Sequence, residues 1–258
     1  MGKKKKTKTE INFKTAYELW QERQNIKRLE TKTPIDELIG GGIEEGEVVE
    51  FYGEYGSGKT QTALTLATRV AGELGEDVVF IDCESTFKPE RVVEIAKARG
   101  LDPEKTLQKI YLIQPITVEE QMEALDQIPK NVKPKLLVVD GVTTLFREEY
   151  VGRGELAERQ GLLRRFLRKL LTYVRENKIY GVITNQVYGN PESSPFLPLE
   201  LRELAVGGHS LYHTIDNRIF IRKAQRGTRI ARLVDSSRYP PAERPFMITD
   251  KGIEPIEK

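Results

Sequence analysis

Apolar runs and amphipathic stretches alternate through the middle of this chain. Leu136, Leu137, Val138 and Val139 form an unbroken apolar run, which is typical of a strand covered on both faces. Strand-like runs occupy 47–52, 77–82, 110–113, 135–140 and 180–184, and helical spacing occupies 15–27, 61–71, 89–99, 118–128 and 155–176. This alternation predicts a mostly parallel central sheet flanked by helices.

The two ends of the chain differ from this middle part. Strand-like runs at 217–222 and 228–234 predict antiparallel C-terminal strands within 216–249, and a loop with little periodicity precedes them at 187–206. Residues 1–12 carry five lysines and are expected to form a disordered basic arm, for which a solubilising role and a DNA-touching role are about equally good interpretations. We divide the remainder into an N-terminal segment and linker at 13–45 and an α/β core at 46–258.

Composition narrows the class of protein. A length of 258 residues suits one large α/β domain with a small appendage. The single cysteine, Cys83, excludes an intramolecular disulfide and a cysteine-based zinc site. No apolar run reaches membrane-spanning length and no signal peptide precedes the domain, so we expect a cytoplasmic protein without membrane contact. Because the net charge is only +2, any nucleic-acid surface must be local.

The most informative motif is the stretch Gly53-Glu54-Tyr55-Gly56-Ser57-Gly58-Lys59-Thr60. It matches G-x-x-x-x-G-K-T, the P-loop pattern, in which backbone N–H groups surround phosphate oxygens. Lys59 would add a positive charge toward the β and γ phosphates, and Thr60 would offer its hydroxyl to Mg²⁺. A glycine-rich turn with a stray lysine is the alternative. It fits poorly, because the motif joins a strand-like run to helical spacing, and a helix N-terminus favours anions. We therefore predict nucleotide binding.

Polar residues at three strand ends are candidates for the rest of the phosphate chemistry. Asp140 ends its apolar strand, where a carboxylate would lie beside Mg²⁺, although a simple strand-end cap is the alternative. Glu84 lies just past the second strand and could orient and deprotonate a water, or be a surface acid. Gln186 ends the fifth strand, where its amide could contact the γ-phosphate, or be a turn residue. The carboxyl ends of parallel strands face one crevice, which would bring all three together.

Two surface features suggest nucleic acid. Arg147, Arg153 and Arg159 flank Gly152 and Gly154, and a mobile basic loop of this kind suits phosphate backbones. The arginines and lysine that continue along the helix, Arg168 and Lys169 above all, also fit a solvated helical face. The loop at 187–206 offers Tyr188 and Phe196 for base stacking. Its acidic residues outnumber its one basic residue, Arg202, and this excess of negative charge is unfavourable for DNA binding.

Together these motifs resemble the RecA/RadA recombinase family, and within it archaeal RadA and its eukaryotic homologues. The resemblance covers 13–254, nearly the whole chain, and implies a RecA-like P-loop ATPase core. It is carried by the P-loop with the following Gln61, and by four further stretches. These are Ile81-Asp82-Cys83-Glu84-Ser85-Thr86-Phe87 with Pro89-Glu90-Arg91, the run from Phe146 to Gln160, Thr184-Asn185-Gln186-Val187, and Val206-Gly207-Gly208-His209.

The resemblance implies a role for each of these residues. Glu84 corresponds to the catalytic glutamate, acting with Lys59 and Gln186, and Gln61 and Arg91 extend the nucleotide site, with Arg91 packing on the adenine. The region from Arg153 to Arg159 and the segment 187–206 correspond to two DNA-binding loops. Gln186 and His209 couple the γ-phosphate to DNA, and Asp235 and Pro240 belong to a cap over the ATP of a neighbouring subunit.

A polymerisation motif and several departures complete the resemblance. Phe13-Lys14-Thr15-Ala16 corresponds to F-x-x-A, whose Phe13 and Ala16 would enter a neighbouring core; on pattern alone they could equally form a contact within the chain. Gly141 follows Asp140 where RadA has Ser, the second loop has Asn190 in place of an arginine, and the cap lacks its early proline. The N-terminal helix-hairpin-helix domain of RadA has no counterpart. These departures favour a paralogue over the principal recombinase.

We therefore expect an ATPase that requires ATP and Mg²⁺, binds single-stranded DNA, and serves homologous recombination and DNA repair. It would form a homo- or hetero-oligomer or filament, with RadA or with itself, through the Phe13 to Ala16 segment. Two alternatives stay open. One is an accessory mediator that binds RadA and modulates its filament without strand exchange of its own. The other is a RecA-fold signalling ATPase that does not act on DNA, against which the arginine-glycine loop argues.

Overall fold

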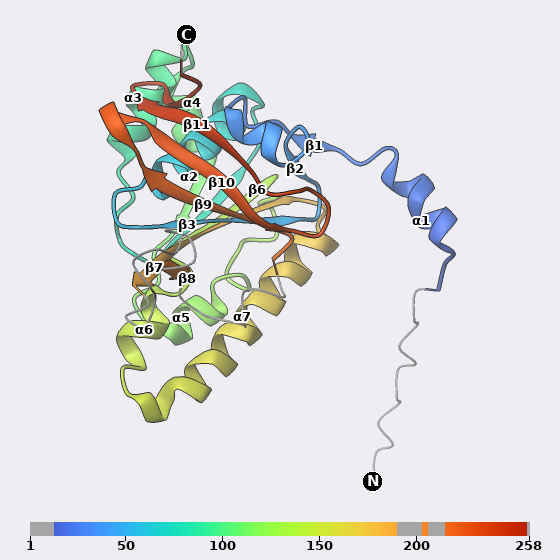
Figure 1. The fold of residues 1–258 in the computed structure, drawn as a ribbon, viewed down its shortest axis with the longest axis vertical. Helices are drawn as coiled ribbons and strands as arrows, with labels where there is room; N and C mark the ends of the chain where they lie inside the picture. Colours follow the sequence, from blue (N-terminus) through green and yellow to red (C-terminus); the bar gives the residue numbers. More distant parts are fainter. Residues whose placement is uncertain (1–12, 190–202, 206–214, 257–258) are drawn as a thin grey trace.

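A single mixed sheet forms the centre of the molecule (Figure 1). The computed structural model describes residues 13–189, 203–205 and 215–256, and within these ranges ten strands form the sheet in the order β12-β11-β10-β9-β3-β7-β6-β4-β5, with β8 beside β7. The strands are β3 (Val48–Gly53), β4 (Val78–Asp82), β5 (Ile110–Ile113), β6 (Leu136–Asp140), β7 (Tyr180–Gly189), β8 (Glu203–Ala205), β9 (Asn217–Lys223), β10 (Arg229–Ser236), β11 (Ala242–Thr249) and β12 (Gly252–Glu254). A separate ladder pairs β1 (Arg28–Leu29) with β2 (Ile43–Glu44).

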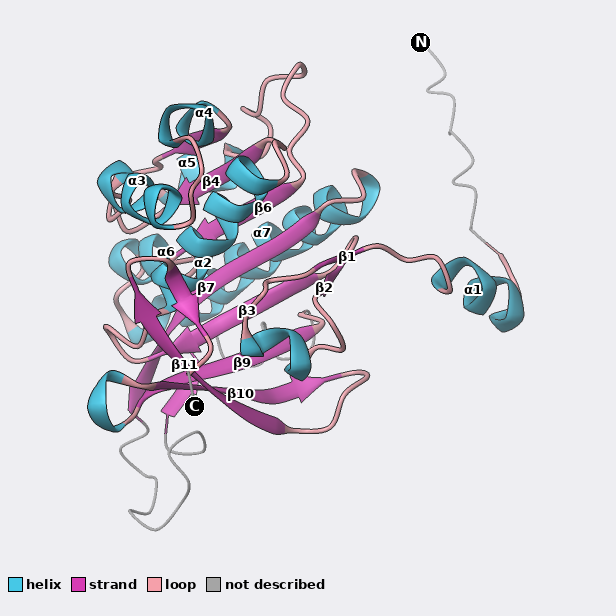
Figure 2. Ribbon diagram, turned by 90° about the horizontal axis from the view of Figure 1, so that it is seen from above, coloured by secondary structure: helices cyan, strands magenta, loops and turns pink. Residues whose placement is uncertain are grey.

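Helices connect the parallel strands and cover both faces of the sheet (Figure 2). They are α2 (Lys59–Thr68), α3 (Pro89–Ala98), α4 (Pro103–Gln108), α5 (Val118–Glu123), α6 (Thr144–Glu149) and α7 (Leu156–Glu176), while a further helix, α1 (Ala16–Arg23), precedes β1 and does not cover the sheet. Short turns of other helix types occur at η1 (Pro34–Leu38), η2 (Arg69–Glu73), η3 (Arg153–Glu155) and η4 (Gln225–Gly227). The predicted fold class, a mostly parallel sheet with antiparallel C-terminal strands, is confirmed. None of the helices in the described ranges is long and apolar enough to cross a bilayer.

The strand register decides which residues meet at the carboxyl edge of the sheet. Strands β3, β7, β6 and β4 are parallel neighbours. Gly53 at the end of β3 pairs with Gln186 of β7, and Asp82 at the end of β4 pairs with Asp140 of β6. The P-loop, Asp140 and Gln186 therefore leave the sheet at one edge, as expected for an open parallel sheet.

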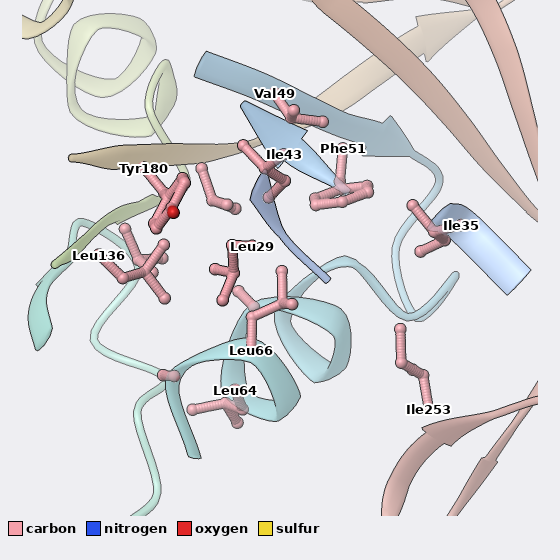
Figure 3. Close-up of a cluster of buried hydrophobic side chains, with 14 of the residues drawn as sticks. Leu29, Ile35, Ile43, Val49, Phe51, Leu64, Leu66, Leu136, Tyr180 and Ile253 are labelled. Atoms are coloured by element: carbon pink, nitrogen blue, oxygen red, sulfur yellow. The ribbon is translucent and has the colours of Figure 1, made fainter. Parts of the chain in front are cut away.

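Two apolar cores lie on opposite faces of the sheet. One packs α2, α3 and η1 against alternate residues of the strands, and Figure 3 shows Phe51 and Val49 of β3 near Leu66 of α2 and Ile43 of β2. The other packs α5, α6 and α7 on the remaining face, with Leu137 and Val139 of β6 at its centre. Leu29, Ile35 and Ile43, from the linker half of the N-terminal segment, belong to the first core. The linker therefore packs as part of the α/β core from β1 onward.

Several predicted boundaries were wrong. The helix expected to reach residue 27 ends at Arg23, and the helix expected to reach residue 128 ends at Glu123. Strand β7 continues to Gly189, inside the segment predicted to be an irregular loop, because β8 supplies an antiparallel partner. Helices α4 and α6 were not predicted, since each is a short turn of six residues with little room for a periodic pattern.

Helix α1 stands away from the core in both views (Figures 1 and 2). A capping box begins it, in which Thr15 and Glu18 satisfy each other's backbone N–H groups. None of its residues is buried, and Phe13, just before it, is 95% exposed. Within the described residues, all hydrogen bonds and ion pairs between α1 and the core come from Arg23.

A ring of polar side chains fastens this helix to the opposite, amino edge of the sheet. Arg23 and Arg238 both donate to Glu44, which is 2% exposed, and Arg23 lies 3.8 Å from Glu47. Asn217 Nδ2 donates to Glu47 Oε2 at 3.3 Å and accepts from Ser236 Oγ at 2.7 Å. Ser236 Oγ accepts from the backbone N–H of Arg238 at 3.1 Å, which closes the ring. The linker and the β10–β11 turn are therefore held by one network, the Glu44–Glu47 ring.

Burial, together with the nearby carboxylates of Glu44 and Asp216, raises the pKa of Glu47 to about 7. The folded chain thus keeps this proton up to about pH 7, whereas the unfolded chain releases it near pH 4.5. Because the folded state binds more protons between these values, the free energy of unfolding falls as the pH rises through this window.

We expect Glu47→Gln, which keeps the neutral shape, to stabilise the protein at pH 8 by about 2 kcal/mol and to change stability little at pH 4.5. Urea unfolding of both proteins at the two pH values measures this. Glu45→Gln, a neighbouring change that removes the partner of Lys135, serves as the control for loss of charge at this edge. An equal effect of Glu47→Gln at both pH values would contradict the assignment.

Candidate nucleotide site and hydrolytic carboxylate

The P-loop joins β3 to α2 and forms the floor of the site. A Cβ at Gly53 would lie 2.1 Å from the Ile221 carbonyl of β9, so only glycine allows this close approach of the two strands. Lys59 is buried, and its Nζ donates to the carbonyls of Gly53 at 3.0 Å and Glu54 at 2.8 Å. Burial lowers the pKa of Lys59, against the opposing effect of nearby Glu84 and Asp140. No side chain caps the N-terminus of α2, where a phosphate would sit.

Asp140 lies beside the first turn of α2, next to Thr60. Its Oδ1 accepts from Thr60 Oγ1 at 3.2 Å and from Thr184 Oγ1, while its Oδ2 is buried and has no hydrogen-bond partner among the described residues. Burial raises the pKa of Asp140 to about 6, and the carboxylates of Glu84 and Asp82 add to this rise. A carboxylate oxygen without a partner beside a threonine hydroxyl is a donor set that fits Mg²⁺. Asp140 and Thr60 would hold the ion.

Glu84 faces this pair from the end of β4. Its Oε1 accepts from Gln186 Nε2 at 2.8 Å and from Thr144 Oγ1 at 3.1 Å. A cavity of about 420 Å³ lies beside it, lined in part by Glu84, Thr144 and Gln186. The structure thus brings together the three strand-end residues that the sequence singled out, together with Lys59 and Thr60. A carboxylate facing an open cavity beside a phosphate site can take a proton from water.

Asp82 supports this arrangement and was missed as a functional candidate. It is fully buried at the last position of β4 and accepts from the backbone N–H groups of Glu84, Thr86 and Phe87 at 3.3, 3.2 and 2.9 Å. The turn that carries Glu84 is therefore wrapped around one carboxylate. The available signal was an aspartate at the end of a strand-like run, which favours turns through side-chain to backbone hydrogen bonds.

Arg91 of α3 lies at the side of the P-loop helix. Its Nε donates to Gln61 Oε1 at 2.8 Å, its Nη1 contacts Glu94 and its Nη2 donates to the Thr249 carbonyl. This places a guanidinium, together with Gln61, next to the start of α2, where the two residues were expected to extend the nucleotide site.

The DNA candidates are spread over several elements. Arg147 is exposed on α6, Arg153 begins η3 and Tyr188 lies in β7, while Arg159 on α7 donates to the Tyr150 carbonyl at 3.1 Å. Lys169 donates to Asp126 and to the Met122 carbonyl, which favours the interpretation of this part of α7 as a surface of internal pairs. Phe196, Arg202 and His209 lie outside the described residues.

The cap candidates lie far from the P-loop of their own chain. Asp235 is near the end of β10, where Ser236 pairs with Asn217, and Asn217 pairs in turn with Val49 at the start of β3. Pro240 follows in the turn that Arg238 fastens to Glu44. The P-loop begins at the other end of β3, about 13 Å away from Val49 along the strand. Asp235 and Pro240 therefore cannot cover a nucleotide bound to the same chain.

Comparison with known proteins places the chain in a family. The family model described as Rad51 matches residues 22–256. The DNA repair and recombination protein RadA of Aeropyrum pernix strain K1 is 41% identical over 256 residues, which cover 96% of this chain and 79% of the relative. The match spans the P-loop, Glu84, Asp140 and Gln186 together with the C-terminal strands. The chain belongs to the Rad51 family.

Proposed function

We propose that this chain is an ATPase that binds single-stranded DNA in homologous recombination and repair, as a paralogue of RadA, with ATP bound between adjacent subunits. One observation carries the proposal: Lys59, Thr60, Asp140, Glu84 and Gln186 converge at one edge of the sheet, whereas Asp235 and Pro240 lie at the other. A site completed from the far edge of a second copy suits a chain that works as an assembly. The Aeropyrum relative, a DNA repair and recombination protein by name, supports the same assignment.

The residues at the carboxyl edge divide the work of hydrolysis. Lys59 is held by two backbone carbonyls and can turn from them to the β and γ phosphates, since a charged acceptor makes the stronger hydrogen bond. Thr60 and Asp140 would hold Mg²⁺, which when bound neutralises charge on the phosphates. Glu84 orients a water and takes its proton, and Gln186, now bonded to Glu84, is within reach of the same γ-phosphate region.

Nucleotide state would reach the DNA surface through β7. Gln186 lies on this strand, immediately before the second proposed DNA segment at 187–206, whose first three residues continue the strand to Gly189. A change in the contact between Gln186 and Glu84 therefore acts directly on the strand that carries the loop. The first loop is attached at α6 and α7, and it supplies Arg147, Arg153 and Arg159 for phosphate contacts.

We expect Lys59→Ala to abolish the tightening of single-stranded DNA binding by ATP, because the variant loses the charge that holds the β and γ phosphates. Loss of such charge-assisted hydrogen bonds would weaken ATP binding about tenfold or more. Fluorescence anisotropy of a labelled oligonucleotide, with and without ATP and Mg²⁺, measures the effect.

Lys105→Ala on the surface of α4 is the matched control and should behave like the unmodified protein. Persistent stimulation by ATP in Lys59→Ala would refute the proposed mechanism. A salt titration of the unmodified protein tests the DNA partner itself, since contacts to Z phosphates predict a log–log slope of about −0.7Z. Absence of binding at low salt would favour an ATPase that does not act on DNA.

An accessory role is favoured by the exposed end of α1. Phe13, Tyr17 and Trp20 are all exposed beside Ala16, on a helix that stands off the core. A helix that displays aromatic residues in this way suits insertion into a neighbouring core, either of RadA or of a second copy. The chain would then modulate a RadA filament through contacts of its own.

We expect Phe13→Ala to weaken capture of RadA, or self-assembly, by about 30-fold, because an aromatic anchor contributes about 2 kcal/mol or more to such contacts. Pull-down with purified RadA and light scattering of the protein alone measure the two cases. Leu74→Ala removes an exposed apolar side chain from the core surface and should change neither. Unaltered binding by Phe13→Ala in both assays would exclude α1 as the polymerisation segment.

A further inference from the structure

We infer that Thr144 is a positioning residue for hydrolysis, that it fixes the Glu84 carboxylate through its hydroxyl, and that Gly141 provides the space for this contact. The inference rests on the proposed function, in which Glu84 activates water, and it adds two residues to that site. Neither residue would touch the nucleotide. Both act through the place that they give to Glu84.

The first observation is that two donors share one oxygen of Glu84. Gln186 Nε2 donates to Oε1 at 2.8 Å and Thr144 Oγ1 donates to the same atom at 3.1 Å. Within the described residues, Oε2 accepts no hydrogen bond. The carboxylate is thus held on one side and leaves its other oxygen for a water, on the border of the 420 Å³ cavity.

The second observation is that Gly141 leaves room for exactly this side chain. A Cβ at Gly141 would lie 2.4 Å from Glu84 Cγ and 2.9 Å from both Glu84 Oε1 and Thr144 Oγ1. Gly141 has a φ of +77°, which side chains of L-residues rarely adopt. Any side chain at this position would push Glu84 away from Thr144.

The turn after β6 explains why the hydroxyl of Thr144 reaches Glu84. The Thr144 N–H donates to the Gly141 carbonyl at 2.9 Å, which closes a turn over Val142 and Thr143. The Gly141 N–H donates to Thr184 Oγ1 at 2.8 Å, which fixes the start of the turn to β7. Thr143 contacts Asn185 at 2.7 Å, while Thr144 faces Glu84. The consecutive residues Thr143 and Thr144 thus bond to β7 and to Glu84, respectively.

The two donors to Glu84 have different fates during the proposed cycle. Gln186 is expected to turn to the γ-phosphate when ATP is bound, and its bond to Glu84 then breaks. Thr144 has no such second task, so its hydroxyl remains to hold Oε1 while Oε2 faces the water. Without Thr144 the carboxylate would lose its last fixed contact at the moment of attack. Small errors in the position of a catalytic group cost large factors in rate.

Single-turnover hydrolysis of ATP, with Mg²⁺, single-stranded DNA and an excess of the full-length chain, tests the inference. We expect Thr144→Val, which keeps the shape but removes the hydroxyl, to lower the saturating rate about tenfold while the half-saturating concentration stays within about twofold. Thr144→Ser should restore the rate to within about twofold. Thr172→Val, a change of the same kind on the exposed face of α7, should leave the rate unchanged.

The variant Gly141→Ala provides a second test in the same single-turnover assay. It should lower the saturating rate at least as much as Thr144→Val, and adding Thr144→Val to it should cost nothing more, because both changes displace the same carboxylate. Thermal melting and the affinity for Mg²⁺–ADP report whether this variant is folded. If it does not fold, the comparison of Thr144→Val with Thr144→Ser decides the question alone.

The outcomes separate this inference from the proposed function. A normal rate in Thr144→Val, or a rate equally poor in Thr144→Ser, would overturn the positioning role and leave the ATPase assignment standing. Absence of ATP hydrolysis by the unmodified chain would overturn the proposed function and this inference with it. A slow Thr144→Val that Thr144→Ser rescues, at unchanged half-saturation, would support both.

Discussion

The buried carboxylate of Glu50 is the interaction on which the site depends most. It lies in the middle of β3 with no exposure, accepts from Arg218 of β9 at 2.6 Å and from Asn185 of β7 at 2.9 Å, and so joins the three central strands. A charge in such a place is tolerated only when paired and hydrogen-bonded. Asn185 in turn accepts from the backbone N–H of Gln186, so the same network fixes the position of β7 where it carries the amide that contacts Glu84.

Much of the site could be predicted from the sequence because its residues lie in short sequence motifs. The P-loop, Asp140 and Glu84 each follow a strand-like run, and parallel strands bring such ends together whatever the rest of the chain does. The parts that escaped prediction depend on distant partners. Strand β7 reaches Gly189 because β8 lies beside it, and Asp82 matters because three backbone N–H groups fold around it. Thr144 stands out only once its hydrogen bond to Glu84 is seen, because nothing in the sequence brings these two residues together.

Two of the departures from the RadA pattern lie in turns whose contacts the structure describes. Gly141 follows Asp140 where RadA has Ser, and a Cβ at this position would lie 2.4 Å from Glu84 Cγ. The cap turn, which lacks the early proline, is fastened to Glu44 by Arg238. In both places the turn that departs from the pattern is held by a hydrogen bond within its own chain, from the Gly141 N–H to Thr184 and from Arg238 to Glu44. Sequence comparison alone would count such positions as losses.

The attachment of α1 through Arg23 has a mechanical consequence. Ion pairs from a single guanidinium, without an apolar contact surface, restrain distance more than direction, so the helix can swing about this point while it stays connected. Subunits joined through α1 would then stay connected while the angle between them varies. An assembly of this kind can change its pitch or curvature to follow a partner polymer without breaking any subunit-to-subunit contact.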